Sequence, residues 1–188
     1  MSAWMNSASI RRAALTAGIV VGLSAPAFAV GSQSDETSPP PKTKTTTTCK
    51  RGQVWDQARK KCVDPKKSEL NDDQIFDAAR EFAYDGQYEN AIKVLNLAKN
   101  QNDPRILNYL GYANRKAGRM ELGMSYYHKA LDIDSNYILA RSYMGQALVE
   151  EGDVQGARVQ LIEIRDRGGE DTWAYRALLQ SLHGYRNY

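Results

Sequence analysis

The chain has 188 residues, of which 42% are hydrophobic and 25% are charged, and its formal net charge at pH 7 is +3. This length accommodates one domain with additional segments. Residues 42–67 carry nine basic and two acidic side chains, a net of +7, whereas residues 68–188 carry 14 basic and 18 acidic, a net of −4. The basic character of the chain therefore belongs to residues 42–67 and not to the C-terminal region. The basic stretch suits an anionic surface, although a solvated tether is the favoured interpretation.

The first 29 residues have the pattern of a secretory signal peptide. Arg11 and Arg12 precede an apolar run over residues 13–23, and Ala27-Phe28-Ala29 forms a small-residue cleavage site. Eleven apolar residues are too few for a transmembrane anchor, which needs about 20. No cysteine closely follows the cleavage site, which argues against a lipid anchor. We therefore expect a mature chain that starts at Val30 and is periplasmic or, as the alternative, secreted. Export by the general or the twin-arginine route stays open.

Residues 30–48 are expected to form a disordered linker rich in Pro, Thr and Lys. The stretch "GSQSDETSPPPKTKTTTT" offers almost nothing that a core could bury, and its three prolines favour extended geometry.

Residues 49–63, "CKRGQVWDQARKKCV", contain both cysteines of the chain. In an oxidising compartment Cys49 and Cys62 are expected to form a disulfide that closes a small hairpin. No metal is expected, because a structural zinc site requires four Cys or His ligands close together. The cysteine spacing faintly resembles half of a peritrophin-type chitin-binding module, which leaves carbohydrate binding as an alternative. No apolar run joins this knuckle to the rest, so its disulfide is expected to be only locally structural.

After a short linker at residues 64–71, the hydrophobic period becomes that of a helix. Ile75, Ala78, Ala79 and Phe82 recur at the spacing of one helical face, and similar series follow through residue 164. Gly111 and Gly145 are 34 residues apart, as are Gly118 and Gly152. This period resembles the tetratricopeptide repeat (TPR), a helix–turn–helix unit of about 34 residues.

The resemblance implies an all-α fold, a short right-handed α-solenoid of three repeats. The repeats are expected at residues 72–103, 104–137 and 138–171, with a capping helix at 172–183. Small residues at Ala79, Gly111 and Gly145 would mark the close approach of the two helices in each repeat. Gly86, Gly118 and Gly152 would provide the turns between the helices.

No constellation of catalytic residues is present, so we expect no enzyme and no cofactor. His128 and His183 lie on expected helices without a matching nucleophile or carboxylate, and none of the common catalytic or phosphate-binding motifs occurs. No nucleic-acid partner is expected either.

The resemblance implies a ligand groove lined by the first helix of each repeat. Binding of a protein or peptide there, as a scaffold or adaptor of the cell envelope, is the expected function. The alternative is a binder of a cell-envelope polymer, such as peptidoglycan or another anionic or carbohydrate surface, that acts through residues 42–67. Family members that bind chaperones hold a C-terminal carboxylate with a clamp of Lys and Asn side chains. This clamp is incomplete here, because only Asn108 and scattered arginines are available. The expected groove residues are Phe76, Arg80, Tyr84, Arg105, Asn108, Tyr112, Arg115, Ser142 and Gln146.

Overall fold

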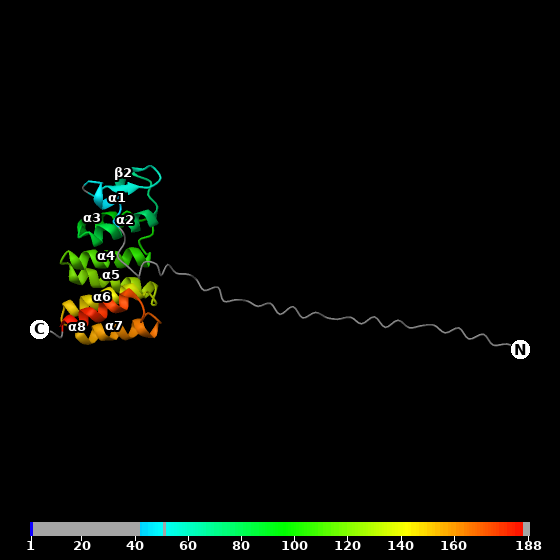
Figure 1. Cartoon of the computed structure of the whole chain (residues 1–188), viewed down its shortest axis with the longest axis vertical. Coiled ribbons are helices and arrows are strands. Elements are labelled where there is room, and N and C mark those ends of the chain that lie inside the picture. The colour runs from blue at the N-terminus through cyan, green and yellow to red at the C-terminus, as the bar shows by residue number, and fades with distance from the viewer. Residues whose placement is uncertain (2–41, 51, 186–188) are drawn as a thin grey trace. The chain divides into compact units, whose positions relative to one another are not determined.

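The computed structural model of the chain describes residues 1, 42–50 and 52–185 (Figure 1). The expected signal peptide, its cleavage site and most of the linker lie outside these residues. The elements are, in order, α1 (Lys44–Thr47), β1 (Val54–Asp56), β2 (Lys61–Val63), the 3-10 turn η2 (Pro65–Lys67), α2 (Asp72–Tyr84), α3 (Tyr88–Leu95), α4 (Pro104–Lys116), α5 (Met120–Ile133), α6 (Ile138–Glu150), α7 (Val154–Asp166) and α8 (Trp173–Tyr185).

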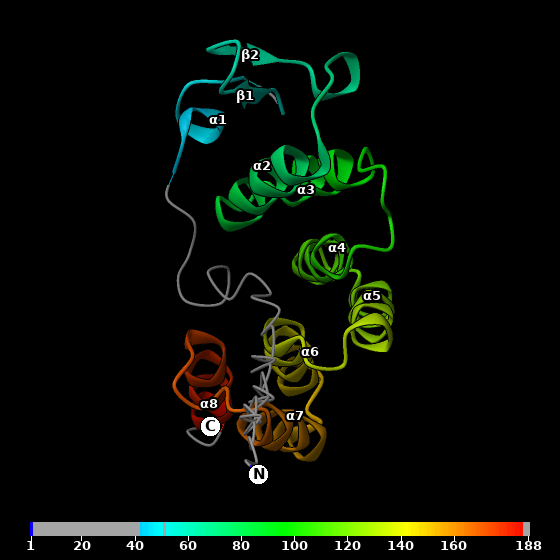
Figure 2. The same cartoon turned by 90° about the vertical axis from the view of Figure 1, so that its right-hand side faces the viewer.

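Helices α2 to α7 form three antiparallel pairs, α2 with α3, α4 with α5 and α6 with α7 (Figures 1 and 2). Consecutive pairs pack on one another, and each expected repeat range contains one pair. Helix α8 packs against both α6 and α7, as the sequence predicted for a capping helix. The all-α solenoid is thus confirmed. Among the described helices, none has the length and apolar content needed to cross a bilayer.

Local sequence signals begin and end these helices. Asn71 and Gln74 form a reciprocal capping box at the start of α2, and Asp103 caps α4 ahead of Pro104. The turn glycines Gly86, Gly118 and Gly152 have φ angles of +78°, +83° and +84°. A Cβ disfavours this left-handed conformation, which explains why glycine occupies each turn.

The small residues inside the helices permit close packing, as predicted. A Cβ on Gly111 would lie 2.6 Å from Cε1 of Tyr127 in α5 and 3.1 Å from the backbone oxygen of Gly123. In the third pair the contact differs. A Cβ on Gly145 would lie 2.6 Å from Cδ2 of Leu178 in α8, and the nearest atom of α7 is farther, at 3.3 Å. Gly145 therefore makes room for the capping helix more than for its own partner.

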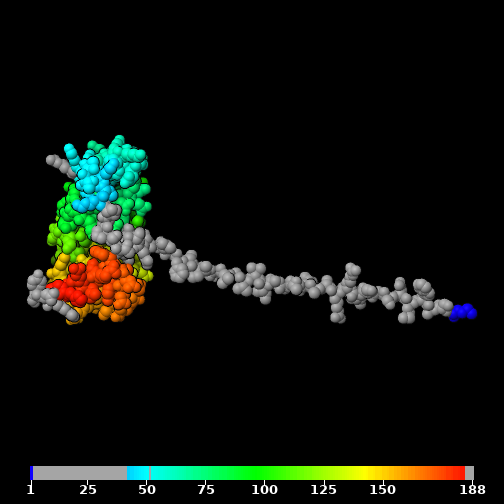
Figure 3. Space-filling model, in the orientation of Figure 1, coloured from blue at the N-terminus to red at the C-terminus, as the bar shows by residue number. Residues whose placement is uncertain are grey.

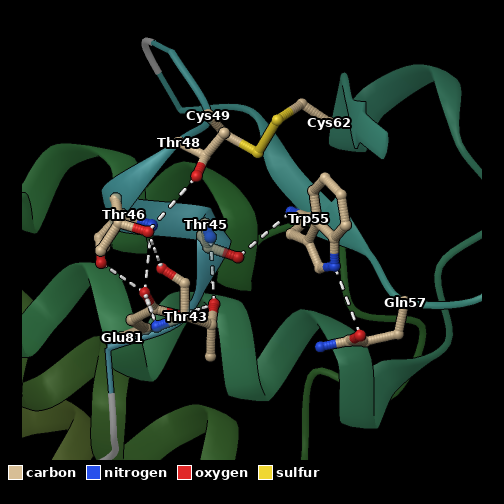
Figure 4. The surroundings of a disulfide bond; sticks show 10 residues. Thr43, Thr45, Thr46, Thr48, Cys49, Trp55, Gln57, Cys62 and Glu81 are labelled. Carbon is tan, nitrogen blue, oxygen red and sulfur yellow. Dashed lines mark hydrogen bonds between the residues drawn. A yellow bond between two sulfur atoms is a disulfide. The ribbon is translucent and has the colours of Figure 1, made fainter. Parts of the chain in front are cut away.

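The expectation of disorder through residue 48 is wrong for residues 42–48. Helix α1 packs against α2 (Figure 4), and Thr45 is buried. In the space-filling view, the cyan N-terminal segment adjoins the green segment at one end of the folded region (Figure 3). Glu81 of α2 is only 4% exposed and accepts hydrogen bonds from the backbone N–H groups of Thr43 (2.7 Å) and Thr46 (3.1 Å) and from both hydroxyls. The threonine run lacks apolar side chains but supplies the donors that a buried carboxylate requires.

Cys49 and Cys62 form the predicted disulfide, and β1 and β2 form the predicted antiparallel hairpin. The knuckle is not independent of the repeats, contrary to the expectation from sequence. Val54 is 2% exposed and belongs to the same buried cluster as the repeat helices, and the backbone N–H of Trp55 donates to Oγ1 of Thr45 (Figure 4). Residues 42–50 and 52–70, here called the N-terminal cap, thus cover the end of the helix stack at α2. The basic stretch 42–67 lies largely within this folded cap rather than in a tether.

Candidate functional site

The first helices of the three pairs, together with α8, share one aromatic surface. The ring centroids of Tyr84 and Tyr112 lie 5.9 Å apart, those of Tyr112 and Tyr143 lie 4.8 Å apart, and those of Tyr143 and Trp173 lie 6.4 Å apart. These four residues, from α2, α4, α6 and α8, are called the aromatic face. Tyr84, Tyr112 and Trp173 are partly exposed, whereas Tyr143 is buried beneath them. A row of rings across four helices is a candidate surface for an extended ligand.

Hydrogen bonds fix the tyrosines of this surface in place. The hydroxyls of Tyr84 and Tyr143 lie 2.7 Å apart, which joins the first repeat to the third. Nε of Arg80 donates to the hydroxyl of Tyr109, beneath the face, at 3.0 Å. Burial, followed by the nearby hydroxyls of Tyr88 and Tyr84, raises the pKa of Tyr112 to about 12. The ring of Tyr112 therefore stays neutral at physiological pH, and the surface offers apolar ring faces with a few fixed hydroxyls.

Four of the nine predicted groove residues retain partial exposure, namely Tyr84, Arg105, Tyr112 and Gln146. Tyr84 and Tyr112 lie side by side on the aromatic face. The guanidinium of Arg105 is held by ion pairs to Asp103 (2.7 Å) and Asp73 (3.0 Å) and lies 5.0 Å from the ring centre of Phe76. Arg105 is therefore already neutralised at the start of α4. Nε2 of Gln146 donates to Oγ of Ser142 one turn away.

The other five predicted residues pack between helices instead of lining an open groove. Phe76 lies edge-on to Tyr109, Nδ2 of Asn108 donates to the hydroxyl of Tyr137, and Oγ of Ser142 donates to the carbonyl of Ala174 in α8. Arg80 is 9% exposed. The sequence pattern could not show that neighbouring helices cover these residues. The five are Phe76, Arg80, Asn108, Arg115 and Ser142.

Arg115 is the most deeply enclosed of these cations. Its side chain is fully buried, and Nη1 lies 3.1 Å from Oε1 of Glu150, which also pairs with Lys116 at 3.0 Å. The guanidinium also lies 5.7 Å from the ring centre of Tyr112. Arg115 thus links the second repeat to the third from beneath the aromatic face, which makes it a packing residue.

The sequence prediction missed two contributors to the aromatic face, Tyr143 and Trp173. Tyr143 follows Ser142 on α6, and the 34-residue offset from Tyr109 was the signal that could have found it. Trp173 lies at the start of the helix expected as a cap, and nothing in the local sequence indicates its contact with Tyr143.

A second candidate site is a pocket of about 300 Å³ between the N-terminal cap and α2. One wall is Trp55, whose ring centre lies 4.3 Å from Nζ of Lys44 and whose Nε1 donates to Gln57. The opposite wall belongs to α2. The lining residues are Thr43, Thr45, Val54, Trp55, Gln57, Gln74, Asp77, Ala78, Arg80 and Glu81. Within the described part of the chain, no group of three or more His, Cys, Asp or Glu side chains is arranged to hold a metal ion.

Comparison with known proteins defines the fold. No protein-family model and no curated protein matches the chain. Among solved structures, the chain is similar to SycD of Yersinia enterocolitica, a type III secretion translocator chaperone, with a TM-score of 0.52 and 18% sequence identity. The match covers 61% of this chain and 83% of SycD. An identity this low relates the two proteins by fold alone. The helix pairs and this likeness together show that the chain has a TPR-like helical-repeat fold.

Proposed function

We propose that this chain is an exported, non-catalytic TPR protein that binds an extended segment of another protein against the aromatic face. The observation that carries the proposal is the row of rings contributed by four helices, in which Tyr84, Tyr112 and Trp173 are partly exposed and the buried Tyr143 contacts both Tyr112 and Trp173. Rigid aromatic side chains with hydroxyls provide contact area at low entropic cost, and they are enriched where proteins bind one another.

Two further observations support this function. SycD, which shares the fold, is described as a chaperone for translocators, and a chaperone acts by binding another protein. The sequence contains a signal-peptide pattern, and the disulfide between Cys49 and Cys62 suits an oxidising compartment such as the periplasm. The partner is accordingly expected among exported or envelope proteins.

The test is a pull-down from envelope extract with the full, oxidised chain as bait. Tyr112→Ala removes the central ring of the aromatic face, and Tyr126→Ala on α5, outside this row of rings, serves as the matched control. We expect Tyr112→Ala to reduce recovery of the bound protein at least tenfold, whereas Tyr126→Ala retains it. Far-UV circular dichroism verifies that both variants keep their helical content. Recovery that is equal for the two variants and is abolished by high salt would contradict this site and favour the basic residues of the N-terminal cap.

A further inference from the structure

The N-terminal cap fixes the point at which the preceding residues reach the aromatic face. Nζ of Lys42 lies 2.9 Å from Oδ1 of Asp85, and the backbone of Thr43 is hydrogen-bonded to Glu81. Asp85 directly follows Tyr84, the first ring of the aromatic face. Lys42 is therefore held at the C-terminal end of α2, next to the position of Tyr84.

The segment that ends at this anchor is rich in proline. Residues 32–41 read "SQSDETSPPP" and lie outside the residues that the structure describes. Proline-rich peptides adopt an extended polyproline II helix without internal hydrogen bonds, and they dock in surfaces lined by aromatic rings at a small entropic cost. Tyr84 and Tyr112, whose rings are stacked and partly exposed, provide such a surface.

The length of this segment matches the width of the face. At about 3.1 Å per residue, the three prolines span roughly 9 Å and the ten residues roughly 30 Å. Packed helices lie about 8–10 Å apart, so this length extends from α2 across α4 and α6 to α8. The segment can thus cover the whole row from Tyr84 to Trp173.

We propose that residues 32–41 bind in cis to the aromatic face, with their prolines against Tyr84 and Tyr112, and compete there with the partner protein. This inference rests on the proposed function, because it assigns the same face an internal ligand. A tether this short gives an effective concentration on the order of millimolar. For a segment whose free peptide binds with a Kd of about 100 µM, occupancy in cis weakens binding of an added peptide about tenfold.

The experiment measures binding of a fluorescein-labelled peptide of residues 32–42 by fluorescence anisotropy. It compares the full, oxidised chain with the variant Pro39→Ser/Pro40→Ser/Pro41→Ser, whose own segment is weakened. The matched control changes Ser32→Ala/Gln33→Ala/Ser34→Ala upstream of the prolines. Tyr112→Ala is added in the triple proline background to locate the site. A peptide in which serine replaces the three prolines tests the role of the prolines.

We expect the proline variant to bind the peptide about tenfold more tightly than wild type, and Tyr112→Ala to abolish this gain. Equal affinity of wild type and the proline variant would overturn occupancy in cis but leave the proposed function standing. Absence of binding to every variant, or binding that Tyr112→Ala does not change, would also overturn it. The pull-down tests the proposed function independently. That function fails if recovery of the envelope partner does not depend on Tyr112.

Discussion

Replacement of Gly111 by alanine tests the packing on which the repeat register depends. The added methyl carbon would lie 2.6 Å from Cε1 and 2.7 Å from Cδ1 of Tyr127. Carbon atoms in contact normally lie about 3.5–4.0 Å apart, so an adjustment of roughly 1 Å is required. Tyr127 is completely buried, and the backbone oxygen of Gly123, also in α5, would lie 3.1 Å from the same methyl carbon. The methyl group therefore requires a shift of the buried Tyr127 ring or of α5 relative to α4.

The magnitude follows from two opposing terms. Overpacking of this kind costs about 1–3 kcal/mol, whereas replacing glycine by alanine within a helix favours folding by about 1 kcal/mol. We therefore expect Gly111→Ala to lower the free energy of unfolding by up to about 2 kcal/mol relative to wild type, or the Tm by up to several degrees, and to be about 1–3 kcal/mol less stable than an alanine substitution at a helical glycine with free space around it. The larger side chain of Gly111→Leu is expected to cost more.

The measurement is urea and thermal unfolding followed by far-UV circular dichroism, with Gly184→Ala as the matched control. Gly184 also lies in a helix, but a Cβ there would have no atom within 4 Å outside its own neighbourhood. Its alanine variant should be as stable as wild type or slightly more so. If Gly111→Ala were no less stable than Gly184→Ala, the close approach of α4 and α5 would not be what requires glycine at this position.

Two further predictions concern the N-terminal cap and the tyrosines. The variant Cys49→Ser/Cys62→Ser loses a cross-link between residues 13 apart, worth about 3 kcal/mol. Because the cap shares its core with α2, the Tm of the helical signal should fall by at least about 5 °C, and a change of a degree or less would show that the cap unfolds independently. Tyr112 keeps its proton up to a pKa of about 12 in the folded chain but only to about 10 when unfolded. Its contribution to stability is therefore complete below pH of about 10 and is lost as the pH rises towards about 12. Urea unfolding at a series of alkaline pH values should show a shallower loss for Tyr112→Phe than for wild type, and identical slopes would refute the assignment.

The sequence by itself determined the helical repeats, because the signals that encode them are local. Glycines 34 residues apart, the turn glycines and the cap at Asp103 each act within a few residues of their own position. The disulfide could also be predicted from the sequence, because only two cysteines are present and the signal-peptide pattern indicates an oxidising compartment. Helical periodicity also placed Tyr84 and Tyr112 on a common side.

Only the tertiary structure decided which neighbour covers each helical face. Periodicity identifies the apolar side of a helix, but it does not show that α8 lies over Gly145 and Ser142, or that Trp173 extends the row of tyrosines. The same limit explains the threonine run. No local signal distinguishes a solvated Thr segment from one whose N–H and hydroxyl groups satisfy Glu81, because the carboxylate they bind lies 35–38 residues away. Hydrogen bonds between distant residues depend on the packing of the whole chain, and that packing turned the expected tether into a cap.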